Sequence, residues 1–247
     1  MAVSEIQAQF VKVPNGSLAI DAYLALPQSD EPKPAVLVIQ EIFGVNDHIR
    51  DVTRRVAAQG YVAIAPAIYQ RQAPGFEVGY DEAGLTQGRI HKNQTKADEL
   101  LSDLDAAIDY LQELPQVKPG PVGCMGFCFG GHVAYLAGTL SRVNAIASFY
   151  GAGIATFMPG GGEPTLSRTA EIVGKLFAFF GLTDPLIPLA QIDQVEATLK
   201  AQINNHQVFR YPEVDHGFFC DQRASYNAAA AADAWEKTLS LFAEQLG

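Results

Sequence analysis

The stretch Val122-Gly123-Cys124-Met125-Gly126-Phe127-Cys128-Phe129-Gly130-Gly131-His132 decides the fold. It predicts a strand that turns sharply into a helix, because Gly126, Gly130 and Gly131 lack a Cβ where the chain must reverse. A side chain at such a turn lies beside a helix N-terminus, where unpaired N–H groups and the helix dipole favour a thiolate and later an oxyanion. We therefore predict that Cys128 is a catalytic nucleophile. The alternative is an ordinary buried cysteine whose neighbouring glycines only allow close packing.

Apolar runs on either side of this stretch predict the other strands and helices. Residues 35–39 are continuously apolar, as in a strand that is covered on both faces of a parallel sheet. A helix that Asn46 or Asp47 can cap and a strand at 61–65 complete a right-handed βαβ unit. The same alternation predicts strands at 145–149, 176–180 and 206–211, and helices at 96–113, 192–201 and 226–246.

The N-terminal part of the chain predicts a β-hairpin. Residues 9–13 and 17–26 flank the turn sequence Pro14-Asn15-Gly16, and apolar side chains alternate along the second run. No composition break or internal repeat interrupts the chain. We therefore predict one α/β domain over residues 1–247, with a doubly wound, mostly parallel sheet flanked by helices and an N-terminal antiparallel hairpin.

Residues 66–95 lack a clear hydrophobic period and predict a long connection. The segment Arg71-Gln72-Ala73-Pro74-Gly75 opens it. Long connections in compact domains are usually functional or partly mobile. We interpret this one as the rim of an active site.

Composition restricts the class of partner. The formal net charge is −10, which disfavours nucleic acid and anionic membranes, because both require a basic surface. No apolar run approaches the roughly 20 residues of a membrane span, and the chain start lacks the basic and apolar regions of a signal peptide. The three cysteines cannot all pair within the chain. We expect a cytoplasmic protein that acts on a small molecule as a monomer or small homo-oligomer.

A cysteine nucleophile needs a base and a group that orients the base. Asp184 follows the predicted strand at 176–180, and His216 follows the one at 206–211, so both lie at carboxyl ends of strands. The order nucleophile, acid, histidine is that of an α/β-hydrolase triad. Asp215 is a second candidate for orienting His216, but adjacent side chains rarely converge on one point.

Glu41 is an unusual residue at the end of the strand at 35–39. The loop that begins there supplies half of the oxyanion hole in α/β-hydrolases. A carboxylate in this loop either repels a resting thiolate or accepts the thiol proton once a substrate displaces its other partners. The alternative is a solvated loop glutamate.

Four segments together resemble the dienelactone hydrolase family: residues 40–46, residues 71–75, the Gly-Phe-Cys-Phe-Gly-Gly turn, and the His216-Gly217-Phe218 loop. The resemblance covers nearly the whole chain. It implies an α/β-hydrolase fold and hydrolysis of lactones or esters by Cys128, His216 and Asp184, without a cofactor or metal. It also implies that Glu41 activates the thiol and that the backbone of Ile42 and Phe129 binds the oxyanion.

The family takes its name from the opening of a carboxylated unsaturated lactone to maleylacetate, an activity called carboxymethylenebutenolidase. Members with that activity hold the substrate carboxylate with arginines, one of them four residues beyond the histidine. This sequence has Cys220 at that position. Arg223 lies nearby and Arg89 lies in the rim segment, so we name these two as candidate substrate-binding residues.

Other functions remain open at this point. The chain could hydrolyse neutral esters or lactones, bind a ligand without turnover, or act as a thiol redox protein in which Cys220 resolves an oxidised Cys128. A zinc site is a further alternative, disfavoured because its two nearest cysteines would flank a strand end; its ligands would be Cys124, Cys128, Cys220 and His216.

Overall fold

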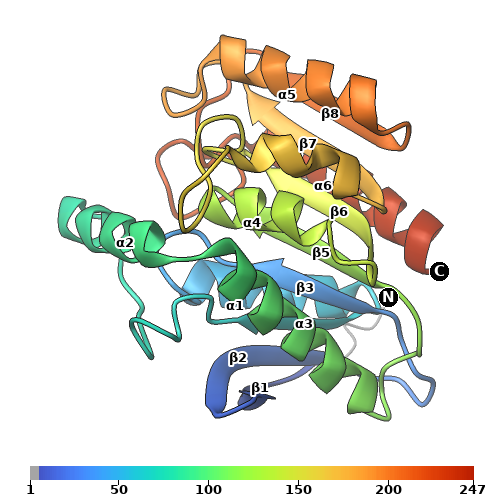
Figure 1. Ribbon diagram of the computed structural model, residues 1–247. Coiled ribbons are helices and arrows are strands. Elements are labelled where there is room, and N and C mark those ends of the chain that lie inside the picture. Colours follow the sequence, from blue (N-terminus) through green and yellow to red (C-terminus); the bar gives the residue numbers. More distant parts are fainter. Residues whose placement is uncertain (1–5) are drawn as a thin grey trace.

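The computed structural model describes residues 6–247, which contain eight strands and six α-helices (Figure 1). The strands are β1 (Ile6–Asn15), β2 (Leu18–Pro27), β3 (Ala35–Ile39), β4 (Val62–Pro66), β5 (Val122–Phe127), β6 (Val143–Phe149), β7 (Lys175–Gly181) and β8 (His206–Tyr211). The helices are α1 (Asp47–Ala58), α2 (Glu82–Gln94), α3 (Ala97–Glu113), α4 (Phe129–Ala137), α5 (Leu189–Gln202) and α6 (Ala228–Leu246), with a 3₁₀ helix at Thr165–Glu171.

All eight strands form one sheet in the order β1-β2-β4-β3-β5-β6-β7-β8. The β1–β2 and β2–β4 pairs are antiparallel, and every pair from β4 to β8 is parallel. This sheet confirms the predicted α/β-hydrolase fold, including the N-terminal antiparallel hairpin. The first βαβ unit is also as predicted, because β3 pairs in parallel with β4.

Helices cover both faces of the sheet. Figure 1 shows α3, α4 and α5 in front of the strands and α1 and α6 behind them. Strands β3, β4 and β5 are therefore buried along their whole length, which explains why their sequences are continuous apolar runs. Helix α3 buries Leu100, Leu104, Ile108 and Leu111 against the sheet. No helix within residues 6–247 combines the length and apolar composition that crossing a membrane requires.

Helix α2 lies inside the segment that the sequence predicts to be an irregular connection, so that prediction is wrong over 82–94. The helix begins at Asp81, whose side chain accepts a hydrogen bond from the Gly84 N–H at 2.7 Å. Its only buried residues are Gly84 and Gly88. A Cβ at Gly88 would come within 2.4 Å of the Ile42 carbonyl oxygen. The helix packs through close backbone contact instead of an apolar stripe, so its sequence carries no strong helical period.

Candidate active site

The turn from β5 into α4 holds Cys128 in a strained backbone conformation. Cys128 has φ 55° and ψ −119°, which non-glycine residues rarely adopt, and it directly precedes the first residue of α4. A Cβ at Gly126 would lie 2.0 Å from the Gly130 oxygen, and one at Gly130 would lie 2.2 Å from the Gln40 oxygen. Only glycine allows strand, helix and the end of β3 to approach so closely. The turn therefore presents the thiol at the N-terminus of α4, as predicted.

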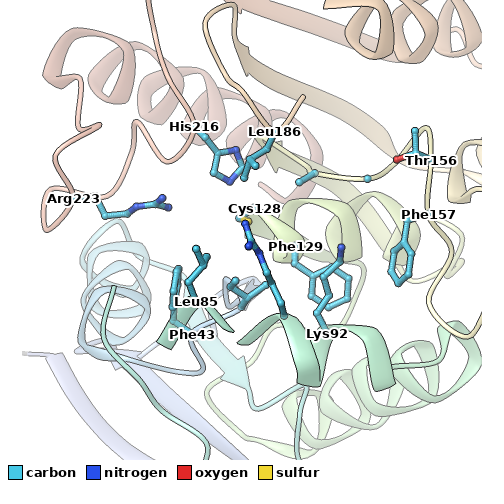
Figure 2. A pocket seen from close by; sticks show the side chains of 14 residues that line it. Phe43, Leu85, Lys92, Cys128, Phe129, Thr156, Phe157, Leu186, His216 and Arg223 are labelled. Atoms are coloured by element: carbon cyan, nitrogen blue, oxygen red, sulfur yellow. The ribbon is translucent and has the colours of Figure 1, made fainter. Parts of the chain in front are cut away.

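Asp184 and His216 come together at the same edge of the sheet. The His216 Nδ1–H donates a hydrogen bond of 2.7 Å to the Asp184 carboxylate, and both side chains are buried. Asp215, the alternative orienting residue, instead accepts a hydrogen bond from the backbone N–H of His216. The other imidazole nitrogen, Nε2, is buried without a hydrogen-bond partner within residues 6–247. Figure 2 shows the imidazole next to Cys128.

The electrostatic environment of His216 favours the imidazolium. Burial lowers the pKa of His216, but the charge of Cys128, when it is a thiolate, and the hydrogen bond to Asp184 raise it more, so that beside the thiolate the pKa reaches about 10. The cationic form is therefore stable only while an anion lies beside it. Where Cys128 carries no charge, the pKa of the imidazole is therefore lower.

Glu41 and Arg223 form a buried ion pair. The Arg223 guanidinium lies 3.1 Å from one carboxylate oxygen of Glu41, whose side chain is only 1% exposed. The second carboxylate oxygen, Oε2, is buried with no hydrogen-bond partner among residues 6–247. Glu41 is thus not the solvated loop residue of the alternative interpretation. A buried carboxylate oxygen without a partner is costly, so this arrangement holds Glu41 ready for a new contact.

Gly217 explains how Arg223 reaches Glu41 from a position three residues beyond Cys220. Gly217 has φ 80°, and a Cβ there would lie 2.5 Å from the nearest guanidinium nitrogen of Arg223. The guanidinium therefore occupies space that only glycine leaves open beside His216. Arg223 supplies a cation at the pocket although Cys220 stands at the position of the family arginine.

Cys220 takes part in a packing contact instead. Its thiol donates to the Tyr80 hydroxyl at 3.3 Å. Burial raises the pKa of the Cys220 thiol to about 11. A thiol that stays protonated is a poor nucleophile toward an oxidised partner, which disfavours the redox alternative.

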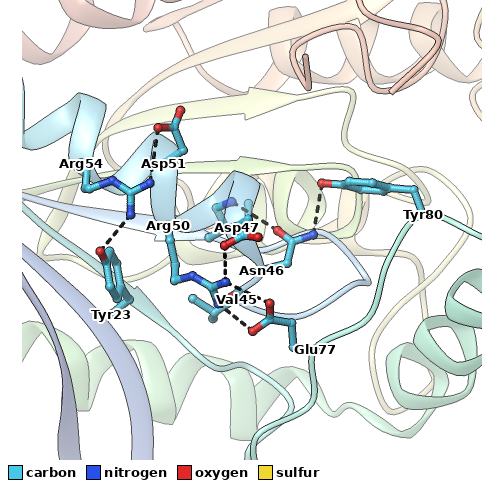
Figure 3. A network of polar contacts seen from close by, with 10 residues as sticks. Tyr23, Val45, Asn46, Asp47, Arg50, Asp51, Arg54, Glu77 and Tyr80 are labelled. Carbon is cyan, nitrogen blue, oxygen red and sulfur yellow. Dashed lines mark hydrogen bonds and ion pairs between the residues drawn. The ribbon is translucent and has the colours of Figure 1, made fainter. Parts of the chain in front are cut away.

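A polar network fixes the loop that follows β3 (Figure 3). The Asn46 side chain accepts a hydrogen bond from the Ile49 N–H, as predicted for a helix cap, and donates to the Tyr80 hydroxyl at 3.1 Å. Arg50 binds the Val45 carbonyl and Glu77, both at 2.6 Å. Segments far apart in sequence are thereby tied together around the loop that carries Glu41 and Ile42.

The predicted oxyanion donors lie at this loop and at the turn. Within residues 6–247, the backbone N–H groups of Ile42 and Phe129 have no hydrogen-bond acceptor. Ile42 and Phe129 both line the same cavity as Cys128. Two free donors beside a cavity-lining thiol are an arrangement that can stabilise an oxyanion.

The cavity above Cys128 has a volume of about 240 Å³. Arg89, Lys92 and Arg223 contribute cationic side chains to its wall, and no acidic side chain of residues 6–247 lines it. The other lining residues are Ile42, Phe43, Leu85, Cys128, Phe129, Ala152, Gly153, Thr156, Phe157, Leu186 and His216. In a protein of net charge −10, this wall is a local concentration of positive charge that attracts anions.

The rim prediction holds for only part of residues 66–95. Helix α2 supplies Leu85, Arg89 and Lys92 to the cavity, whereas residues 71–75 do not line it. Arg71 is bound to Asp103 through two contacts of 2.6 and 2.9 Å. Residues 71–75 therefore do not contact a ligand in this cavity, whereas Arg89 and Arg223 do reach it.

Sequence reasoning missed Lys92 and Tyr150. Leu85, Arg89 and Lys92 follow the i, i+4, i+7 spacing of one helix face, a signal that becomes visible only once α2 is recognised. Tyr150 has φ 36° and a buried hydroxyl without a partner among residues 6–247, and its ring centroid lies 5.0 Å from that of His216. Nothing in the local sequence marks Tyr150, because its ring contact with His216 joins residues that are far apart in the chain.

Comparisons with known proteins agree with this geometry. The pattern of the dienelactone hydrolase family matches residues 20–246. A protein of Synechocystis sp. named "Putative carboxymethylenebutenolidase" is 58% identical over 242 residues, which is 98% of each chain. One of the same name from Methylorubrum extorquens is 34% identical, covering 94% of this chain and 79% of the other. The crystal structure titled "Putative Dienelactone Hydrolase" from Klebsiella pneumoniae is 30% identical with a TM-score of 0.88, and covers 97% of this chain and 99% of that chain.

Proposed function

Because the chain belongs to the dienelactone hydrolase family, we propose that it opens a lactone or ester that carries a carboxylate, with Cys128 as nucleophile. The Glu41–Arg223 ion pair beside a cationic cavity is the observation that carries this proposal. A substrate carboxylate is the chemical group that both competes with Glu41 for Arg223 and is attracted by Arg89.

Substrate binding is coupled to activation of the thiol. When the substrate carboxylate pairs with Arg223, Glu41 loses the contact that holds one of its oxygens. Its carboxylate then accepts the thiol proton of Cys128, because a buried carboxylate without a cation needs a donor. The thiolate forms only with substrate in place, which protects it from oxidation in the free enzyme.

Acylation forms one bond and breaks another. The Cys128 sulfur attacks the carbonyl carbon, and the N–H groups of Ile42 and Phe129 hold the resulting oxyanion. Collapse of this intermediate forms the thioester and breaks the carbon–oxygen bond of the ester. The departing oxygen leaves as an enolate that tautomerises, or takes a proton from the His216 imidazolium.

Hydrolysis of the thioester requires a neutral imidazole. Acylation removes the sulfur charge, which is the largest of the causes that raise the pKa of His216, so the imidazole can lose its proton. Neutral His216, oriented by Asp184, then takes a proton from water as the water attacks the thioester. As the carboxylic acid leaves, Glu41 returns the thiol proton to the sulfur and pairs with Arg223 again, and the imidazole returns to its initial state.

The test compares an unsaturated lactone acid with its methyl ester at several salt concentrations. We expect kcat/KM to favour the acid by about tenfold or more at low salt, since one charge-assisted contact contributes about 1.5 to 3 kcal/mol. Added salt should reduce this preference, because it screens the cationic wall. Arg223→Gln should reduce it too, whereas Lys200→Gln, which removes an exposed lysine on α5, should leave it unchanged.

A preference for the methyl ester at low salt would show that the substrate is neutral. Hydrolysis of neither compound, nor of simple aryl esters, would contradict the proposed activity itself.

A further inference from the structure

Lys92 is a cation that lacks a carboxylate partner. Most lysine and arginine side chains within residues 6–247 pair with a carboxylate, including Arg223 with Glu41. Lys92 forms no ion pair and no side-chain hydrogen bond among these residues, although acidic residues outnumber basic ones in the sequence. Its partner is therefore not supplied by the described part of the chain.

Aromatic rings hold the Lys92 ammonium group. Its nitrogen lies 4.4 Å from the centroid of the Phe157 ring and 5.8 Å from that of Phe129. Burial lowers the pKa of Lys92, against the opposing effect of the Cys128 charge. A cation that has lost part of its water shell attracts an anion more strongly than one at the surface, and the rings keep it in place.

Lys92 and Arg223 lie on different sides of the nucleophile. Figure 2 shows the Arg223 guanidinium on one side of Cys128 and the Lys92 ammonium on the other, beside Phe157. The two reach the cavity from separate elements, since Lys92 lies on α2 and Arg223 follows β8. One carboxylate at Arg223 therefore leaves the positive charge of Lys92 without a partner.

We propose that Lys92, between Phe129 and Phe157, forms a second anion subsite, so that the substrate is a dicarboxylate: a lactone or ester with one carboxylate on each side of the scissile bond. This inference rests on the proposed hydrolase activity and specifies its substrate class. Lys92 is a specificity-determining residue in it. Arg89, which is exposed on the same face of α2, adds positive charge at the entrance.

Four aryl esters test the proposal. They are 4-nitrophenyl butyrate, which is neutral; 4-nitrophenyl hemisuccinate, with a carboxylate on the acyl side; 3-carboxy-4-nitrophenyl butyrate, with a carboxylate on the leaving-group side; and 3-carboxy-4-nitrophenyl hemisuccinate, with both. The kcat/KM of each charged ester, divided by that of the neutral ester, is measured for wild type, Lys92→Gln, Lys92→Arg, Arg223→Gln and the surface control Lys200→Gln.

We expect Lys92→Gln to lower this ratio about tenfold or more for the dianion and for one of the two monoanions. Arg223→Gln should lower it for the dianion and for the other monoanion. Lys92→Arg should restore most of the loss, and Lys200→Gln should match wild type. The proposal is overturned if Lys92→Gln leaves every ratio unchanged, as it would if it slowed all four esters equally. It is also overturned if Lys92→Gln and Arg223→Gln lower the ratio of the same monoanion.

Calorimetry separates this inference from the hydrolase activity. The anilide counterpart of the dianionic ester, with nitrogen in place of the scissile oxygen, is titrated into wild type and Lys92→Gln. An affinity about tenfold weaker in the variant supports the second subsite whether or not the esters are turned over. Equal affinity, or no binding to wild type, overturns it.

Discussion

Cys124 and Cys128 are four residues apart on one continuous segment, yet their surroundings make them chemically different. Cys124 lies within β5, fully buried opposite Leu37 of β3 and Ile146 of β6, and burial raises the pKa of its thiol far above the ordinary range. Cys128 lies just beyond the strand, where the backbone takes a positive φ and the side chain faces the cavity. The comparison teaches that the backbone turn, and not the residue type, decides which thiol reaches the cavity.

The largest expected difference between the two cysteines is in catalysis. We expect Cys128→Ala to lower kcat for lactone or ester hydrolysis by more than about 10³-fold, because covalent catalysis is lost. Cys128→Ser should recover little of this, since an alcohol is far less acidic than a thiol. Steady-state kinetics and a thermal melt of each variant are the measurements. Near-wild-type turnover by a folded Cys128→Ala protein would place the nucleophile elsewhere.

Glu41 sharpens the comparison, because the proposed mechanism has it activate Cys128 and gives it no role at Cys124. We expect Glu41→Gln to lower kcat by roughly 10² to 10⁴, the range for loss of a general base. Arg223 loses its partner in this variant, so binding of a non-hydrolysable lactone acid should become no weaker. An unchanged kcat would mean that His216 alone activates the thiol.

The titration of His216 reports which cysteine carries the neighbouring charge. With a non-hydrolysable lactone acid bound, so that Cys128 is a thiolate, the pKa of His216 should be raised to about 10; in Cys128→Ala with the same ligand it should lie toward 6.5, whereas Cys124→Ala should leave it raised. Imidazole proton NMR against pH measures both. A group whose pKa is raised on folding stabilises the folded protein below its unfolded pKa, and this contribution is lost as pH rises through the folded value. With this ligand bound, wild-type stability should therefore decline toward pH 10 more steeply than that of Cys128→Ala.

The smallest expected effect on activity is that of Cys124→Ala. This change removes a small buried group from the centre of the sheet and should lower the free energy of unfolding by about 1 kcal/mol. For a chain of this size the melting temperature should fall by about 2 to 4 °C. A large loss of kcat at unchanged melting temperature would show that the strand cysteine has a chemical role.

Local sequence predicts the parts of the molecule whose patterns are local. The strands around Cys128 are apolar because helices cover both faces, and the glycines of the turn are required by backbone contacts within a few residues. The positions of Asp184 and His216 follow from the rule that loops at the carboxyl ends of parallel strands meet at one edge. These features are therefore predictable from the order of the residues alone.

Other parts depend on contacts between distant segments. Helix α2 has no apolar stripe, since Gly84 and Gly88 provide its packing. The sequence therefore does not predict the helix, nor that Lys92 lies on its cavity-facing side. Arg223 and Glu41 are 182 residues apart in the sequence. Their contact depends on the space that Gly217 leaves open. Arg71 matches the family pattern locally but is bound to Asp103. Such contacts become visible only in three dimensions.

Trapping of the acyl enzyme tests the central claim most directly. An activated ester is mixed with the protein, the reaction is quenched in acid within the first turnover, and peptide mass spectrometry locates the added acyl group. We predict one acyl group on the peptide that contains Cys128, in wild type and in Cys124→Ala, and none in Cys128→Ala. Acylation of Cys124 or Cys220 instead, or full turnover with no acylated cysteine in any variant, would contradict the assignment of Cys128 as the nucleophile.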